Sequence, residues 1–294
     1  MIESICVAGA GTMGSGIALS AALSDFKVIL FDLNPEMLIV AKEVIAANLD
    51  FLITKQKITE LQKQQVLTSI NFTPLATDCI ADLVIEAIVE RLDVKIEFFQ
   101  TISTINKGDT IFASNTSSFS ITSLQQNIPN PARVAGMHFF NPAHVMKLVE
   151  VVKGEHTDDK TIEVLFALCT DLKKHPVRCS DAPGFIVNRV ARHYYLEAMN
   201  LVENNVADIR SIDQAMELMG FKLGPFKLMD LIGLDINYLV SESIYNAFDH
   251  AARFKPSELQ RKKVLNQELG KKTGKGFYDY TNLSMGQQPE AVWP

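Results

Sequence analysis

A glycine-rich segment near the start of the chain has the spacing of a dinucleotide-binding loop. It follows the pattern Gly-x-Gly-x-x-Gly and consists of Gly9, Ala10, Gly11, Thr12, Met13 and Gly14. In such a loop the first glycine permits a tight turn, the second lets the backbone approach a pyrophosphate, and the third lets the next helix pack on the sheet. The N-terminus of that helix then faces the anion. The segment therefore predicts a dinucleotide site, and the alternative is an ordinary glycine-rich turn.

Asp32 lies 18 residues after Gly14, at the end of the next apolar run. A carboxylate at that point accepts hydrogen bonds from the hydroxyls of the adenosine ribose. It would repel a 2′-phosphate, and residues 33–35 offer no cation to receive one. The sequence therefore favours NAD over NADP as the cofactor.

Two ionisable residues farther along lie in or beside apolar runs. Glu150 lies within the run 148–152, where a carboxylate without a partner has a large desolvation cost. His138 closely follows the run 134–136, at the kind of strand end where open α/β sheets place reactive groups. If the chain turns back between them, Glu150 orients the imidazole, and His138 takes the proton of a substrate alcohol while a hydride leaves for a nicotinamide. Spacing alone leaves open a structural histidine beside an independently satisfied glutamate.

Polar side chains in two other places can hold a substrate oxygen. The stretch 114–118, which includes Ser117, follows the apolar run 111–113, so its hydroxyls fall at a strand end. The alternative for Ser118 or Ser120 is a helix cap. Asn188 lies in an otherwise apolar helix start and needs hydrogen bonds, either from a ligand carbonyl or from neighbouring backbone.

The elements that must position these residues alternate between strands and helices. Short apolar runs predict strands at 5–8, 28–31, 83–85, 111–113, 134–136 and 148–152. Helical segments such as 94–105 separate them, and the period of 35–67 predicts a hairpin of two helices. This alternation predicts an α/β fold with a Rossmann-type, doubly wound parallel sheet.

The pattern changes after Asp181, where Ala182, Pro183 and Gly184 interrupt it. Helical periods follow at 185–203, 211–219 and 234–252. We therefore expect two domains: residues 1–182 form an NAD-binding Rossmann domain with a helical hairpin insertion, and residues 183–294 form a smaller all-α domain for substrate binding and dimerisation.

Composition narrows the class of protein. The 294 residues carry a net charge of −6, which argues against a nucleic-acid-binding surface. The four cysteines form no Cys-x-x-Cys pair, so the sequence predicts no zinc site and favours a reducing compartment. The chain starts without a basic leader and has no continuous apolar run of about 18 residues. We therefore expect a cytoplasmic protein that binds no membrane and no metal.

A series of motifs in one consistent order resembles a known family. The motifs are GAGTMGSGIA, VIEAIVERLDVK, ASNTSSFSIT, GMHFFNPAHVMKLVEVV, PGFIVNRV, LGPFKLMDLIGLD and GKKTGKGFYDY. From residue 5 to about residue 280 the chain resembles the L-3-hydroxyacyl-CoA dehydrogenases, particularly their single-chain bacterial members, the 3-hydroxybutyryl-CoA dehydrogenases.

The resemblance implies roles for individual residues. It implies that His138 is the catalytic base and Glu150 its partner, and that Ser117 and Asn188 hold the reacting oxygen and the thioester. Residues that it places beside NAD are Glu90, Lys95, Ser117, Asn141 and Lys272. It also implies that Asn48 and Lys55, on the helical hairpin, contact CoA. For Lys55 the alternative is a position on a solvated helical face.

The function that follows is hydride transfer between NAD(H) and C3 of a short 3-hydroxyacyl-CoA or 3-ketoacyl-CoA. The alternatives are a dehydrogenase of the same fold that acts on a free hydroxy or sugar acid, and a non-catalytic NAD-binding relative. The resemblance also implies a homodimer through the helical domain. The apolar run Leu231-Ile232-Gly233-Leu234 is consistent with such an interface and equally with an ordinary core.

Overall fold

A computed structural model describes residues 2–126, 128–281 and 290–291. The chain divides into two compact units, Met1–Phe185 and Ile186–Pro294. From the sequence we placed this division between residues 182 and 183. Residues 282–289 and 292–294 of the predicted second domain lie outside the described residues.

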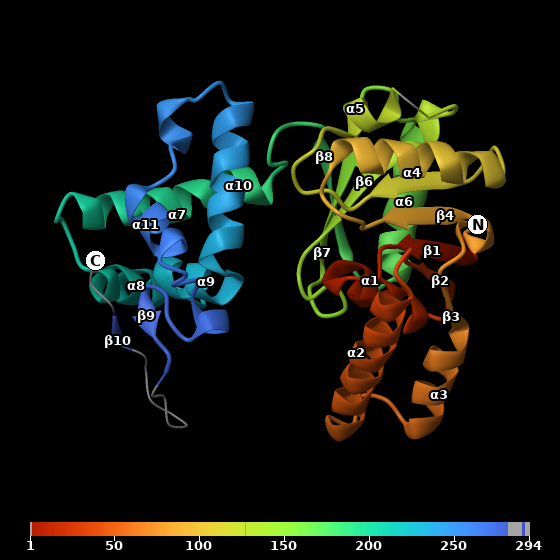
Figure 1. Cartoon of the computed structure of the whole chain (residues 1–294), viewed down its shortest axis with the longest axis horizontal. Coiled ribbons are helices and arrows are strands. Elements are labelled where there is room, and N and C mark those ends of the chain that lie inside the picture. Colours follow the sequence, from red (N-terminus) through yellow and green to blue (C-terminus); the bar gives the residue numbers. More distant parts are fainter. Residues whose placement is uncertain (1, 127, 282–289, 292–294) are drawn as a thin grey trace. The chain divides into compact units, whose positions relative to one another are not determined.

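Unit 1 is built on an eight-stranded sheet of order β3-β2-β1-β4-β5-β6-β7-β8 (Figure 1). The strands are β1 (Ser4–Ala8), β2 (Lys27–Phe31), β3 (Ile70–Thr73), β4 (Leu83–Glu86), β5 (Ile111–Ser114), β6 (Val134–Phe139), β7 (Leu148–Lys153) and β8 (His175–Ser180). The strands from β3 to β6 in this order run parallel, as the Rossmann prediction requires. The predicted fold class is therefore confirmed.

The sheet departs from the predicted parallel arrangement at β7, which pairs antiparallel with β6. Only residues 140–147 connect the two strands. A parallel crossover needs about a dozen residues or more, so this short link can only return the chain antiparallel. The consequence is that residues of β6 and β7 face each other directly across the ladder.

Helices cover both faces of the sheet, and β1 shows how the sequence achieves this. Ile5 and Val7 belong to the core that contains α1 (Thr12–Ala22) and α6 (Asp159–Asp171). Cys6 and Ala8 belong to the opposite core, which contains α4 (Leu92–Ile105) and α5 (Ile121–Gln125). Successive side chains of a strand point to opposite faces, so a strand buried on both faces is continuously apolar.

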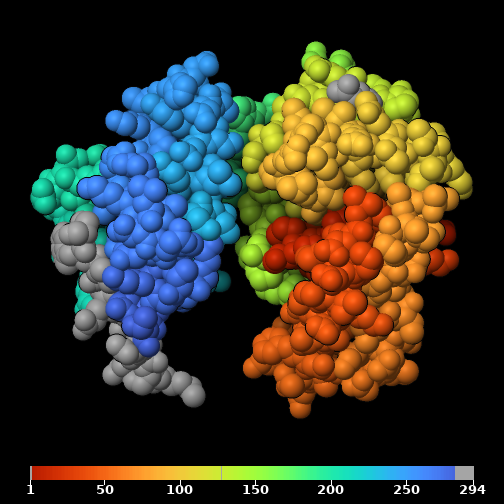
Figure 2. All heavy atoms as spheres, viewed as in Figure 1, coloured from red at the N-terminus to blue at the C-terminus, as the bar shows by residue number. Residues whose placement is uncertain are grey.

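The predicted hairpin is confirmed as α2 (Pro35–Thr54) and α3 (Glu60–Ser69), which form one lobe of the surface of unit 1 (Figure 2). Helix α2 begins after Asn34, whose side chain accepts a hydrogen bond from the backbone of Glu36. Helix α3 begins with a capping box between Thr59 and Gln62. The buried residues of α2 recur every three or four positions, namely Leu38, Ala41, Ile45 and Leu49.

Unit 2 is mainly helical, as predicted. Its helices are α7 (Val187–Glu203), α8 (Ile209–Leu218), α9 (Pro225–Ile232), α10 (Leu234–Ala247) and α11 (Glu258–Leu265), and β9 (Tyr278–Asp279) pairs with β10 (Glu290–Ala291). Buried Asp230 on α9 accepts hydrogen bonds from the backbone N–H groups of Phe277 and Tyr278, at 2.9 Å each. This carboxylate therefore fastens the segment after residue 270 to the helices.

Candidate active site

The glycine-rich loop has the geometry of a pyrophosphate site. Gly9 has a φ of +98°, and a Cβ there would lie 2.5 Å from the carbonyl oxygen of Ala87. A Cβ on Gly14 would lie 1.7 Å from the carbonyl oxygen of Gly9. A Cβ on Gly11 would meet nothing within 4 Å. The first and third glycines are thus required by packing, and the second faces open space at the N-terminus of α1, where a phosphate can approach.

Asp32 lies beside this loop at the end of β2. Its Oδ2 accepts a hydrogen bond of 2.8 Å from the backbone of Ala10, and its Oδ1 accepts one of 2.9 Å from Asn34. A cleft of about 660 Å³ opens here between Asp32 and largely apolar walls, and its described lining contains no lysine or arginine. The remaining lone pairs of the carboxylate can accept the ribose hydroxyls. The absence of a cation from the lining suits NAD better than NADP.

His138 and Glu150 meet across the antiparallel ladder of β6 and β7. The imidazole Nδ1 lies 2.7 Å from Oε2 of Glu150. Because an ionised carboxylate can only accept, Nδ1 donates and Nε2 is left for a substrate proton. Glu150 is 1% exposed and His138 is 6% exposed, and the rings of Phe140 and Phe185 lie 4.6 and 5.7 Å from the imidazole. The predicted contact is therefore present in an apolar surrounding that strengthens it.

Lys95 lies 1% exposed between two carboxylates. Its Nζ is 2.5 Å from Oε1 of Glu86 and 3.0 Å from Oε2 of Glu90. Burial alone would raise the pKa of Glu90, but the charge of Lys95 and hydrogen bonds from Thr116 and Ser117 lower it below its ordinary value. Glu90 therefore remains an anion at neutral pH, held at the loop after β4.

Glu86 was missed from the sequence, although it carries the same signal as Glu150. It ends the apolar strand β4 and is completely buried. Besides the ion pair with Lys95, its Oε2 accepts a hydrogen bond of 2.6 Å from Ser114 at the end of β5. Glu86 thus ties together the ends of β4 and β5 and the helix α4.

The segment after β5 places Ser117 close to these groups. The backbone N–H of Ser117 donates to Glu90 at 3.2 Å, and its hydroxyl lies 3.2 Å from that of Ser118. Asn115 accepts a hydrogen bond of 2.9 Å from the backbone of Phe139, the residue after His138. The ends of β4, β5 and β6 are therefore joined at one edge of the sheet. Ser120 instead caps α5, which was the alternative for that residue.

Asn48 and Asn141 line a second groove, of about 360 Å³, together with Thr12 and His144. The side chain of Asn48 also donates to the carbonyl of Val44 at 2.8 Å. Lys55 is exposed and lies over the ring of Phe51, 5.4 Å from its centroid. It is not among the described lining residues of this groove, so the structure places the two predicted CoA contacts in different surroundings.

Asn188 and Lys272 belong to unit 2. Asn188 lies in the first turn of α7, and its carbonyl accepts a hydrogen bond of 3.3 Å from Arg192. Lys272 forms an ion pair of 2.6 Å with Asp235. Their approach to the substrate and to the cofactor stays a prediction.

Comparison with known families identifies the chain. The model of the 3-hydroxyacyl-CoA dehydrogenase NAD binding domain matches residues 4–182, and that of the 3-hydroxyacyl-CoA dehydrogenase C-terminal domain matches residues 184–280. The chain belongs to the 3-hydroxyacyl-CoA dehydrogenase family. The resemblance seen in the motifs is confirmed, and so are, at the level of the family, the enzyme class and NAD as its cofactor.

Individual relatives agree with this membership. The chain is 46% identical to 3-hydroxyadipyl-CoA dehydrogenase of Escherichia coli over 95% of its own length, and it spans 59% of that longer protein. It is 41% identical to a probable 3-hydroxybutyryl-CoA dehydrogenase of Bacillus subtilis, covering 95% of this chain and 98% of that protein. A crystal structure of (S)-3-hydroxybutyryl-CoA dehydrogenase from Ralstonia eutropha matches with a TM-score of 0.91 and 37% identity, covering 96% of this chain and 100% of that one.

Proposed function

We propose that this protein interconverts short 3-hydroxyacyl-CoA and 3-ketoacyl-CoA thioesters with NAD as the hydride carrier, 3-hydroxybutyryl-CoA and acetoacetyl-CoA being the preferred pair. The observation that carries the proposal is the buried contact of 2.7 Å between His138 and Glu150 at the sheet edge that also holds the glycine-rich loop. An imidazole with one nitrogen oriented by a carboxylate is suited to move a proton to or from an alcohol oxygen.

In the oxidative direction the 3-hydroxyl lies against Nε2 of His138 and the hydroxyl of Ser117. His138 removes the O–H proton, and the C3–H bond breaks with its electron pair as the carbonyl forms. When bound, NAD⁺ supplies the acceptor for that hydride. Glu150 stabilises the imidazolium that results. In the reductive direction the same imidazolium returns the proton to the oxygen. Asn188 is proposed to hold the thioester.

The acyl group is the finer part of the proposal. The names of the relatives include both a 3-hydroxyadipyl-CoA and a 3-hydroxybutyryl-CoA dehydrogenase. The relatives that match this chain over nearly their whole length include the 3-hydroxybutyryl type, which supports the shorter acyl group. Steady-state comparison of the butyryl and adipyl thioesters decides between them.

The main test follows NADH loss by absorbance with acetoacetyl-CoA, alongside NADPH as cofactor and free acetoacetate as substrate. We expect rapid turnover only with the thioester and NADH. Saturation with free acetoacetate but not with the thioester would transfer the proposal to a hydroxy-acid dehydrogenase. A stable protein that binds NADH and turns over neither substrate would be a non-catalytic relative.

We further propose that the protein is a cytoplasmic homodimer formed through unit 2. Side chains that support this interface lie exposed on α9 and α10, with Leu231 at 53% and Leu239 at 66%. Leu234, from the same apolar run, is instead buried in the core of unit 2. None of the described helices is long and apolar enough to cross a membrane. Sedimentation of wild type and Leu239→Asp tests the dimer, since the variant should shift toward the monomer.

A further inference from the structure

A buried lysine without a carboxylate partner lies beside the segment that follows His138. Lys174 is 6% exposed, and it forms no ion pair with any carboxylate that the structure describes. A buried lysine usually pairs with an acid, because the ammonium loses its hydration on burial. Burial accordingly lowers the pKa of Lys174. The hydrogen bonds of this ammonium therefore have to offset the cost of burying it.

The ammonium of Lys174 binds two backbone carbonyls of the connection between β6 and β7, which consists of residues 140–147. Its Nζ donates to the carbonyl of Ala143 at 2.6 Å and to that of Met146 at 2.9 Å. The connection is also closed internally, because the carbonyl of Pro142 accepts from the N–H groups of Val145 and Met146, at 2.9 Å each. Charge-assisted hydrogen bonds are stronger than neutral ones. Lys174 therefore holds the connection more firmly than the neutral bonds within it.

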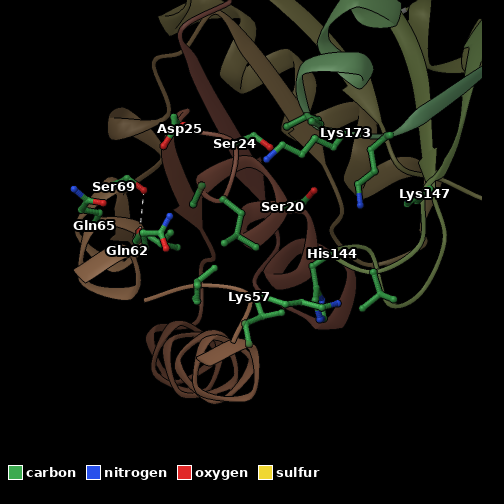
Figure 3. A pocket seen from close by; sticks show the side chains of 18 residues that line it. Ser20, Ser24, Asp25, Lys57, Gln62, Gln65, Ser69, His144, Lys147 and Lys173 are labelled. Atoms are coloured by element: carbon green, nitrogen blue, oxygen red, sulfur yellow. Dashed lines mark hydrogen bonds between the residues drawn. The ribbon is translucent and has the colours of Figure 1, made fainter. Parts of the chain in front are cut away.

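The end of α6 directs Lys174 toward the connection. The helix ends in a Schellman motif, in which Lys173 has a φ of +56° and the N–H groups of Lys173 and Lys174 donate to carbonyls of the last helical turn, at 2.9 and 2.7 Å. The next residue, His175, donates to the carbonyl of Lys147 at 2.7 Å. The backbone on both sides of Lys174 is thus fixed. Figure 3 shows the pocket of about 550 Å³ that Lys174 lines together with Lys173, Lys147 and His144.

Helix α1 contacts the same connection from another side. Ala143 is 1% exposed, and a Cβ on Gly16 of α1 would lie 3.1 Å from the Cβ of Ala143 and 3.3 Å from its backbone nitrogen. The backbone of α1 therefore packs directly on Ala143, while the carbonyl of Ala143 binds Lys174. Because α1 begins at the glycine-rich loop, the two contacts fix the connection relative to the cofactor site.

The connection carries a residue on which the proposed reaction depends. Asn141 lines the groove of about 360 Å³ together with Gly11 and Thr12 of the cofactor loop, and the resemblance places it beside NAD. His138 lies three residues before Asn141 on the same chain segment. A shift of the connection would move one wall of this groove and the backbone that follows the base. A displacement of about 1 Å at a reacting centre can lower the rate by about 10².

We infer that Lys174 is a positioning residue for hydride transfer. It holds the connection against α1, so that Asn141 faces the cofactor loop and the chain after His138 keeps its place. The inference rests on the proposed function, because hydride transfer is the step whose geometry Lys174 secures. Lys174 is not among the described residues that line the groove, so it acts through the connection. The alternative is a lysine that stabilises the fold and has no effect on the rate.

The first experiment measures kcat with acetoacetyl-CoA per NADH-binding site, the sites being counted by fluorescence titration. Lys174→Met keeps the apolar stem and removes the donors, so kcat per site should fall by about tenfold or more, while KM for acetoacetyl-CoA stays within about threefold. The control is Lys173→Met, which removes the same charge from the exposed neighbouring residue and should keep the wild-type kcat. A purely stabilising lysine would lower the number of sites and leave kcat per site above about half of the wild-type value, which would overturn the inference.

Gly16→Ala tests the connection from the side of α1 and does not depend on the folding of a lysine variant. Its Cβ would meet Ala143 at 3.1 Å, so the connection has to move by a few tenths of an ångström. Alanine is the better helix former, so α1 should still fold. We expect kcat to fall by about threefold or more, and by less in the Lys174→Met background, where the connection is no longer held. A wild-type kcat for Gly16→Ala, or additive effects of the two substitutions, would contradict the inference.

Hydrogen exchange separates this inference from the proposed function, because it needs no turnover. The full chain with NADH is compared by mass spectrometry between wild type, Lys174→Met and Lys173→Met. Exchange in residues 140–147 should be about tenfold faster or more in Lys174→Met alone, since two hydrogen bonds to this segment are lost. Equal exchange in wild type and Lys174→Met refutes the inference even if acetoacetyl-CoA is turned over. If the wild type uses no CoA ester, the proposed function fails, whereas faster exchange still supports the hold of Lys174 on the connection.

Discussion

Glu150→Gln is the sharpest test of the proposed chemistry, because it removes a charge and keeps the shape. The side-chain oxygen of glutamine can still accept from Nδ1 of His138, so the orientation and tautomer of the ring are preserved. What is lost is the attraction between the carboxylate and the imidazolium that forms as the substrate proton arrives. For unit charges ~4 Å apart at an effective dielectric constant of ~20, that attraction is about 4 kcal/mol.

An energy of this size in the transition state corresponds to about 10³ in rate, and the amide dipole retains part of it. We therefore expect kcat with acetoacetyl-CoA to fall by about 10²–10³, with KM for NADH unchanged. Glu155→Gln, an exposed acid five residues along, is the control and should keep wild-type kcat. The reasoning fails if Glu150→Gln keeps more than about a third of the wild-type kcat while folding normally, since the carboxylate then does not face a developing charge.

Four further outcomes are expected. His138→Gln should lower kcat by about 10²-fold or more and leave NADH binding intact by fluorescence titration, and near-normal turnover would mean that another group is the base. Gly14→Ala should destabilise the loop, because its Cβ meets the carbonyl of Gly9 at 1.7 Å, whereas Gly11→Ala should unfold like the wild type and bind NADH more weakly. Lys95→Met should lower the free energy of unfolding by ~3–5 kcal/mol in urea, because it leaves buried Glu86 without its counter-charge, and a loss below ~1 kcal/mol would contradict this. Burial raises the pKa of Cys169 and Cys179 to about 12, so at neutral pH the native protein should react with a thiol reagent far more slowly than the denatured chain, which should titrate all four cysteines.

Short sequence patterns were sufficient to predict the structure where the type of one residue determines the backbone geometry. The spacing of Gly9, Gly11 and Gly14 predicts a tight turn, a close approach of the backbone to a pyrophosphate, and packing of the next helix on the sheet. Each of these features depends on a few consecutive residues. The hairpin was equally accessible, since α2 buries residues at a helical period. The contact between His138 and Glu150 required a further prediction, that the chain turns back after residue 140. The shortness of the link between the two strands implies this turn, and it also explains why β7 runs antiparallel.

What the sequence did not reveal depends on contacts between distant segments. Strand β8 is an edge strand in which Cys179 is the one buried residue, so it shows no apolar run. Glu86 did carry a signal, an acid at the end of the apolar run 83–85, and the argument applied to Glu150 would have found it. Its pairing with Lys95 on α4 could not have been foreseen from spacing.

The two buried carboxylates at the sheet edge have different roles because they pair with different side chains. Glu86 faces the ammonium of Lys95, whose proton the proposed reaction does not use, so that pair holds β4, β5 and α4 in register. Glu150 faces the imidazole of His138, whose charge changes in every turnover. The first pair should therefore affect stability more than rate, and the second should affect rate more than stability. Measuring both quantities on Lys95→Met and Glu150→Gln separates the two roles, and a variant that loses both equally would show that the groups act as one network.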